Sequence, residues 1–165
     1  MCSIPFVLTT ADLGSGKSTL AKAVQAKHSD FARFSIDAII ADRHGIYDRD
    51  YAPEEYDAHQ NEAEDIYRQS FREMLIEGKR DIVLDRSFYA KSDRDEFREL
   101  VESLDGRAVL VYLMVPKEEL WRRIVQRRNE GVNADSAREL SWELLGMYLE
   151  DFEEPKGESE VVIAS

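Results

Sequence analysis

The chain has 165 residues, of which 22 are Lys or Arg and 34 are Asp or Glu, so its formal net charge at pH 7 is −12. This length favours one domain with one sizeable core, and the apolar and charged fractions, 43% and 34%, exclude a disordered tail. The acidic excess argues against nucleic-acid backbone binding as the main activity, because such binding needs a positively charged surface.

The single cysteine and the N-terminal segment bear on where the protein works. Cys2 alone cannot form an intrachain disulfide or a zinc site of several cysteines, which suits a reducing compartment. No apolar run approaches the roughly 18–20 residues that span a bilayer, and residues 1–8 lack the basic start of a signal peptide. The sequence therefore predicts a cytoplasmic protein that has no membrane partner.

Five apolar segments, rich in β-branched or aromatic residues, alternate with helical patterns. They lie at residues 4–10, 31–36, 81–85, 108–115 and 160–164. Strands that alternate with helices are typical of βαβ units and a parallel sheet. Residues 108–115 are apolar on both faces, as in a strand covered by helices on each side. The pattern predicts a three-layer α/β/α fold with a five-stranded parallel sheet, in one domain that covers residues 1–165.

Helical patterns fill the intervals between these segments. Pro53 is suited to the first turn of a long helix with apolar residues at a spacing of three or four, and Gly78 ends that helix. Ser92 with Asp95 resembles a capping box at the start of another helix. The predicted helices cover about residues 17–28, 37–43, 53–77, 92–104, 116–131 and 135–152.

Residues 11–18, with the sequence ADLGSGKS, follow the first predicted strand and open the first helix. They match the Walker A pattern G-x-x-x-x-G-K-[ST], except that Ala11 replaces the first glycine. The remaining glycines let successive backbone N–H groups surround an anion, and the helix N-terminus adds partial positive charge. Lys17 can reach the β- and γ-phosphates, and the Ser18 hydroxyl can join a Mg²⁺ shell. A glycine-rich turn without a ligand is the alternative, but the position between strand and helix favours a phosphate loop.

Two carboxylates follow predicted strands, at the edge where parallel sheets bind ligands. Asp37 comes after the second strand and could accept a proton from an attacking hydroxyl; an N-cap of the short helix is the alternative. Asp85 ends the third strand, as a Walker B aspartate does, and could hold Mg²⁺ directly or through water. A loop carboxylate satisfied by backbone donors is the alternative for Asp85. Arg86 and Ser87 come next and could face the substrate.

Arginines are concentrated in the helix that begins at Pro116. Arg123 and Arg127 are four residues apart, so they project from one face of that helix. Their guanidinium groups could stabilise a transferring phosphoryl group or stack on adenine. Residues 123–140 would then form a helical lid that excludes water. The alternative is that these arginines oppose the helix dipole and pair with nearby carboxylates.

The order of these motifs resembles that of a family of small kinases. Besides the phosphate loop and the arginine-rich helix, it includes a Ser-x-Asp at 35–37, Leu-Asp-Arg-Ser at 84–87 and YLEDFEEP at 148–155. Over about residues 4–164 the chain resembles the AAA-type P-loop kinases related to polynucleotide kinase, chloramphenicol phosphotransferase and zeta toxin. The resemblance implies a kinase-type P-loop NTPase fold, with the strand of Asp85 beside the phosphate-loop strand. It also implies ATP and Mg²⁺ as cofactors and Asp37 as the base.

The sequence thus predicts an ATP-dependent phosphotransferase that moves the γ-phosphoryl group to a hydroxyl of a small molecule, such as an antibiotic, a sugar or a nucleoside-like compound. A 5′-hydroxyl nucleic-acid or nucleoside kinase and a non-catalytic nucleotide-binding regulatory module are the alternatives. The predicted catalytic residues are Lys17, Asp37 and Arg127, and the predicted metal ligands are Ser18 and Asp85. The residues predicted to contact ATP are Leu13, Gly14, Ser15, Gly16, Lys17, Ser18, Thr19 and Arg123.

Overall fold

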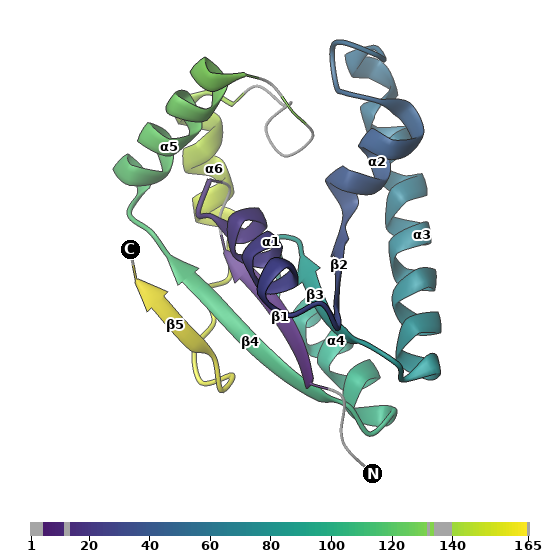
Figure 1. The fold of residues 1–165 in the computed structure, drawn as a ribbon. Coiled ribbons are helices and arrows are strands. Elements are labelled where there is room, and N and C mark those ends of the chain that lie inside the picture. Colours follow the sequence, from purple (N-terminus) through teal and green to yellow (C-terminus); the bar gives the residue numbers. More distant parts are fainter. Residues whose placement is uncertain (1–4, 12–13, 132, 134–139, 165) are drawn as a thin grey trace.

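The computed structural model describes residues 5–11, 14–131, 133 and 140–164, in which strands and helices alternate along the chain (Figure 1). The elements are β1 (Pro5–Ala11), α1 (Lys17–Lys27), β2 (Phe31–Ser35), α2 (Ile36–His44), the 3-10 turn η1 (Pro53–Glu55), α3 (Tyr56–Glu77), β3 (Asp81–Asp85), α4 (Lys91–Ser103), β4 (Arg107–Met114), α5 (Lys117–Glu130), α6 (Trp142–Asp151) and β5 (Val161–Ala164).

The strands form one sheet in the order β2-β3-β1-β4-β5, and every neighbouring pair is parallel. The parallel α/β fold that the sequence predicts is therefore present. The strand that ends at Asp85 lies beside the phosphate-loop strand, as the family resemblance implies. Because β1 is central, the chain leaves it at the middle of the carboxyl edge of the sheet, where ligands bind in open α/β folds.

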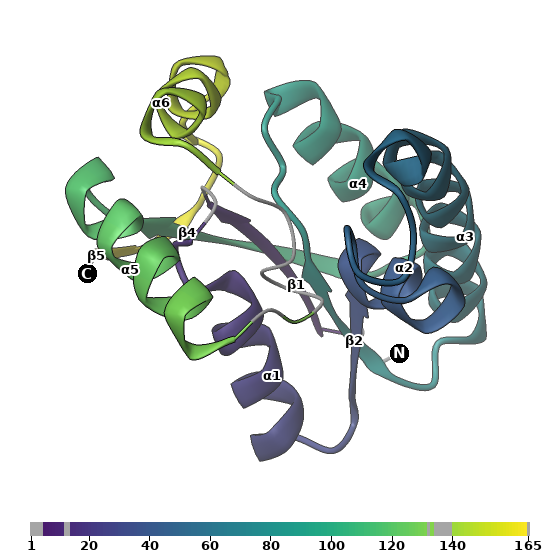
Figure 2. The same ribbon diagram turned by 90° about the horizontal axis from the view of Figure 1, so that it is seen from above.

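Helices cover both faces of the sheet. Viewed from above, α1 and α5 lie on one side and α3 and α4 on the other, with α2 next to α3 (Figure 2). The larger core lies between the sheet, α3 and α4, and burying each of its side chains contributes roughly 1.5–3 kcal/mol. Its members are Tyr67, Phe71, Leu75, Ile82, Leu84, Phe88, Phe97, Val101 and Leu110. A smaller core joins α5 to α6 through Val115, Leu120, Ile124 and Leu145.

Two helix N-termini clarify the sequence predictions. Ser35 is the N-cap of α2, and its hydroxyl accepts a hydrogen bond from the Ala38 N–H at 3.3 Å. This cap rules out Asp37 as the N-cap residue. The capping box predicted for Ser92 and Asp95 is wrong, because the N-cap of α4 is Ala90, two residues before Ser92.

A residue from the far end of the chain takes the place of that capping box. The carboxylate of Glu153 accepts a hydrogen bond from the Lys91 N–H, and the Glu153 N–H donates to the Tyr89 carbonyl oxygen at 2.9 Å. An acidic side chain at a helix N-terminus also interacts favourably with the helix dipole. The segment after α6 therefore fixes where α4 starts.

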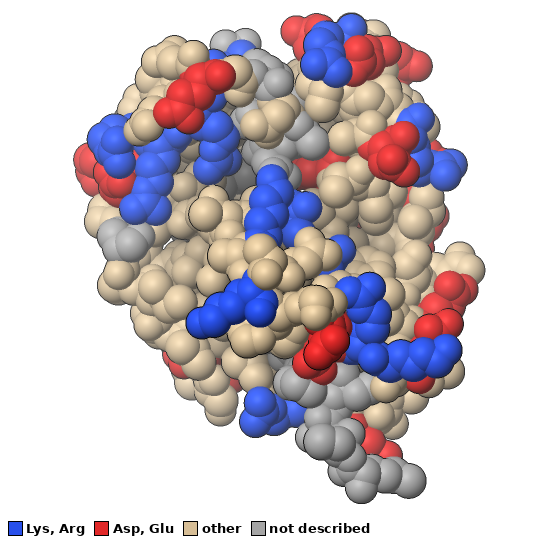
Figure 3. Space-filling model, in the orientation of Figure 1, with Lys and Arg blue, Asp and Glu red and all other residues tan. Residues whose placement is uncertain are grey.

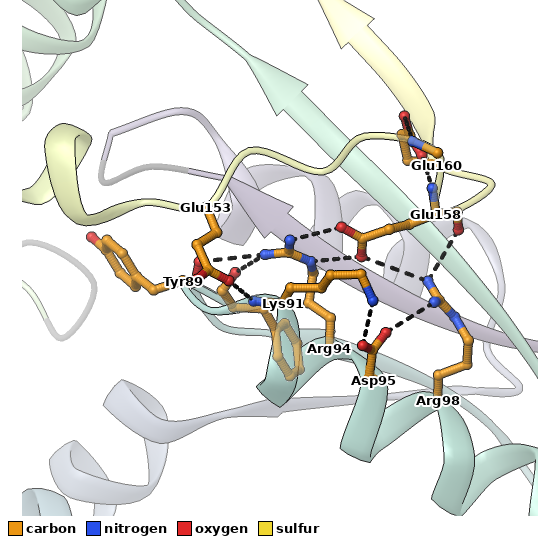
Figure 4. A network of polar contacts seen from close by, with 10 residues as sticks. Tyr89, Lys91, Arg94, Asp95, Arg98, Glu153, Glu158 and Glu160 are labelled. Carbon is orange, nitrogen blue, oxygen red and sulfur yellow. Dashed lines mark hydrogen bonds and ion pairs between the residues drawn. The ribbon is translucent and has the colours of Figure 1, made fainter.

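A buried ion pair holds the same segment further along α4 (Figure 4). Arg94 donates from Nε and Nη2 to the Glu158 carboxylate at 2.9 and 2.8 Å, and the two side chains are only 1% and 4% exposed. Arg94 Nη1 also donates to the Phe88 carbonyl oxygen at 2.9 Å. Arg98 donates to the Glu158 carbonyl oxygen at 3.1 Å. The network links the C-terminal segment, α4 and the loop that follows β3.

The last helix, α6, begins at a side-chain cap. Ser141 is the N-cap of α6, and its hydroxyl accepts from the Leu144 N–H at 3.1 Å. The predicted start of this helix near residue 135 lies outside the described residues. Among the helices that are described, none is both long enough and apolar enough to cross a bilayer.

Candidate active site at the phosphate loop

The turn between β1 and α1 requires its glycines. Gly14 and Gly16 have φ values of 82° and 103°, in the left-handed region that only glycine adopts without strain. A Cβ on Gly14 would also lie 2.9 Å from the Ile124 side chain. Both glycines are therefore needed for the backbone to turn into α1. Leu13, which the sequence predicts to contact ATP, lies outside the described residues.

A cavity of about 80 Å³ lies against this turn. Since about 10–15 Å³ accommodates one water, the cavity has room for several waters or a phosphate group. Its walls come from the phosphate loop, α2, the end of β3 with the residues that follow it, and α5. It is lined by Gly14, Gly16, Lys17, Ser18, Asp37, Asp85, Arg86, Ser87 and Arg127. The structure thus brings together all three predicted catalytic residues and both predicted metal ligands.

Of the described residues, the other predicted ATP contacts, Ser15, Thr19 and Arg123, are not part of the cavity lining. The Ser15 hydroxyl is buried and has no hydrogen-bond partner within the described part of the chain. Such a group is costly unless it is satisfied, and a phosphate oxygen would satisfy it. Arg123 donates to the Ser15 carbonyl oxygen at 3.3 Å and to Glu119 at 2.6 Å, so it contacts the backbone of the loop. Thr19 is exposed on α1.

Ser18 and Asp85 form the part of the site suited to a metal ion. The Ser18 hydroxyl donates to Asp85 Oδ1 at 3.2 Å. Hydroxyl and carboxylate oxygens beside phosphate groups are the ligands that Mg²⁺ uses, so these residues fit a nucleotide-bound Mg²⁺. The other carboxylate oxygen of Asp85 accepts from Arg33 Nε at 2.8 Å and Nη2 at 2.5 Å.

The sequence pattern alone does not indicate a role for Arg33. The only signal was a basic residue inside the short strand β2, since a charge in a buried strand needs a partner. The pairing of β2 with β3 brings that partner close, because Arg33 is opposite Val83 and Ser35 is opposite Asp85.

Asp37 stands in the first turn of α2, next to a group of aromatic side chains. Burial raises the pKa of Tyr51, and the negative charge of Asp37 raises it further. The Tyr51 ring is edge-on to His59, with centroids 4.6 Å apart, and His59 stacks on His44 at 3.7 Å. Tyr47 also contacts Tyr51, with centroids 6.1 Å apart. No sequence pattern predicts this cluster, because its members lie in a loop and on two helices.

Arginines contribute to the cavity from two directions. Arg127 lines it from α5, and on the face seen in Figure 3 basic side chains lie over α1 and α5. Arg86 is held by Glu64 at 2.7 Å and lies over the Phe88 ring at 4.9 Å from the centroid. This local positive charge in an acidic chain suits an anionic ligand. The predicted lid at 123–140 includes residue 132 and residues 134–139, which lie outside the described residues.

The fold and the cavity define a class of protein. A parallel sheet, a glycine-containing turn from its central strand into a helix, and an aspartate at the end of the next strand are the parts of a kinase-type P-loop fold. The sequence matches the family described as AAA domain over residues 13–155, and the chain belongs to that family. No curated protein matches the sequence.

Solved structures of kinases share the fold. A candidate kinase from Chloroflexus aurantiacus superposes with a TM-score of 0.75 at 16% identity, over 98% of this chain and 88% of that one. A gluconokinase from Sinorhizobium meliloti superposes with a TM-score of 0.61 at 22% identity, over 97% of this chain and 82% of that one. A chain of the Pnkp1/Rnl/Hen1 RNA repair complex superposes with a TM-score of 0.71 at 14% identity, over 90% of this chain and 44% of that one. At these identities the similarity establishes the fold.

Proposed function

We propose that this protein is an ATP-dependent phosphotransferase that moves the γ-phosphoryl group to a hydroxyl of a small molecule, such as an antibiotic, a sugar or a nucleoside-like compound. One observation carries the proposal: a carboxylate, Asp37, lines the same cavity as Lys17, Ser18 and Asp85. A regulatory module needs only the nucleotide-binding part of such a site. A carboxylate in the same cavity can also orient an acceptor hydroxyl and take its proton, which transfer to a hydroxyl uses.

The nucleotide side of the site would work through charge and backbone donors. The N–H groups of the turn at Gly14 and Gly16 surround the phosphates, and Lys17 contacts the β- and γ-oxygens. Ser18 and Asp85 would hold Mg²⁺, which when bound neutralises charge on these oxygens. The main contribution is electrostatic stabilisation in a partly enclosed site.

The acceptor side would work through Asp37 and Arg127. Asp37 orients the acceptor hydroxyl and takes its proton, while the hydroxyl oxygen bonds to the γ-phosphorus. The bond between that phosphorus and the β,γ-bridging oxygen breaks, and ADP leaves with the electron pair. Arg127 compensates the charge of the transferring group, as an arginine finger does.

Replacing Lys17 by Met tests the nucleotide part of the proposal. We expect phosphoryl transfer to fall by at least about 10²-fold and ATP to bind more weakly, because a charge-assisted contact to the phosphates is lost. Lys27→Met, at the exposed end of the same helix, is the matched control and should behave like the wild type. Equal ATP affinity and turnover in Lys17→Met and the control would contradict the assignment.

Replacing Arg127 by Met tests its role during transfer. Turnover with ATP and an acceptor should fall by about 10³-fold, while ADP affinity changes by no more than a few-fold, because the charge that Arg127 compensates develops in the transition state. Arg122→Met, which removes an exposed guanidinium paired with Glu119, is the control. A drop in ADP affinity as large as the drop in turnover would assign Arg127 to ground-state binding instead.

The acceptor can be identified with labelled ATP and separate panels of antibiotics, sugars, nucleosides and oligonucleotides. The proposal predicts label on a small molecule, and the gluconokinase similarity makes sugars the first panel. A polynucleotide 5′-hydroxyl kinase is the second candidate, favoured by the similarity to the RNA repair complex. Label on oligonucleotides alone would support that candidate.

A further inference from the structure

Arg33 neutralises Asp85 before any ligand arrives. Two hydrogen bonds from Arg33 go to the same oxygen, Asp85 Oδ2, from Nε at 2.8 Å and Nη2 at 2.5 Å. The two side chains are 13% and 3% exposed, so water screens this pair much less than a surface pair. Among the described residues, the second oxygen, Oδ1, accepts a hydrogen bond from a neutral donor, the Ser18 hydroxyl at 3.2 Å.

The ion pair with Arg33 lowers the attraction of Asp85 for a cation. The attraction from the carboxylate is offset by the repulsion from a guanidinium a few ångströms away, and both act strongly where water is scarce. At Asp85 a divalent cation therefore meets a nearly neutral pair, and nucleotide phosphates are the source of further negative charge beside it.

We propose that Arg33 is a positioning residue that makes metal binding at Ser18 and Asp85 conditional on bound nucleotide. The inference depends on the proposed function, which assigns Mg²⁺ to these two residues. Arg33 keeps Asp85 oriented with Oδ1 toward Ser18. Metal affinity at this site stays low until a bound triphosphate supplies negative charge. A purely structural role for Arg33 leads to the opposite expectation, because its removal would then disorder Asp85 and weaken metal binding.

The test measures Mn²⁺ binding to the nucleotide-free protein by electron paramagnetic resonance of the free ion. Arg33→Gln keeps a hydrogen-bond donor but removes the charge, and it should bind Mn²⁺ at least about tenfold more tightly than the wild type. Arg33→Lys, which keeps the charge, should remain close to the wild type. Adding Asp85→Asn to Arg33→Gln should abolish the gain. Unchanged or weaker Mn²⁺ binding in folded Arg33→Gln would overturn the proposal. A gain in Mn²⁺ affinity that persists when Asp85→Asn is added would also overturn it.

Arg33→Gln leaves the Asp85 carboxylate buried without its counter-charge, which destabilises the folded protein. A second measurement therefore covers a variant that does not fold. If this variant does not fold alone, Mn²⁺ should restore its thermal unfolding transition, and failure to do so would also overturn the inference. ADP binding to the wild type is measured in parallel. A wild type that binds no ADP contradicts the proposed function, whereas the Mn²⁺ comparison concerns Arg33 alone.

Discussion

Replacing Asp37 by Asn is expected to lower phosphoryl transfer by about 10²–10⁴-fold and to leave the affinities for ADP and ATP within a few-fold of the wild type. The amide keeps the size of the side chain but cannot take the proton of the acceptor hydroxyl. The Ser35 hydroxyl caps α2, so the substitution does not remove a cap from that helix. The effect should therefore be on turnover rather than on folding or nucleotide binding.

Turnover is followed as ADP release in the presence of the acceptor, and nucleotide binding by calorimetry. Asp42→Asn is a matched control, because Asp42 is an exposed carboxylate on the same helix and is not part of the cavity lining. The control should transfer phosphoryl groups at the wild-type rate. Wild-type turnover in Asp37→Asn would remove this residue from the mechanism, whereas a wild type that binds nucleotide but transfers to no acceptor would favour the regulatory module.

Replacing Glu158 by Gln is expected to lower the free energy of unfolding by about 3–5 kcal/mol. The substitution leaves the Arg94 guanidinium buried without its counter-charge, and an uncompensated buried charge is strongly unfavourable. The C-terminal segment should also separate from α4, because the same ion pair attaches it there (Figure 4). Urea unfolding followed by circular dichroism measures the change.

Two further variants test the cause of the lower free energy of unfolding in Glu158→Gln. Lys156→Met removes an exposed ion pair with Glu154 in the same segment and should leave the unfolding curve close to that of the wild type. Arg94→Met combined with Glu158→Met should recover part of the loss, because neither charge is then buried. A double variant less stable than Glu158→Gln would show that the contact from Arg94 to the Phe88 carbonyl oxygen is the larger contribution.

The sequence predicts the parts of the fold and site that depend on local pattern. The phosphate loop is recognisable because glycines, Lys17 and Ser18 must be contiguous to surround an anion. Asp37 and Asp85 were predictable for a different reason: strands of a parallel sheet end at one edge, so residues that follow them converge. These two rules account for the cavity lining from the loop and the strand ends.

The features that the sequence does not predict are contacts between distant residues. Arg33 and Asp85 are 52 positions apart, and the cap that Glu153 provides at Lys91 spans 62 positions. No local sequence pattern indicates such pairs. The capping-box prediction at Ser92 was wrong for this reason, because a cap from outside the helix moved its start. The aromatic group near Asp37 likewise forms only when α2 packs beside α3.

The most direct measurement is a crystal structure with Mg²⁺ and a non-hydrolysable ATP analogue. The account predicts the triphosphate within the turn at Gly14 and Gly16, its β- and γ-oxygens at Lys17 and its terminal phosphorus facing the Asp37 carboxylate. A turn that stays empty at saturating nucleotide, or a terminal phosphate directed away from Asp37, would contradict it.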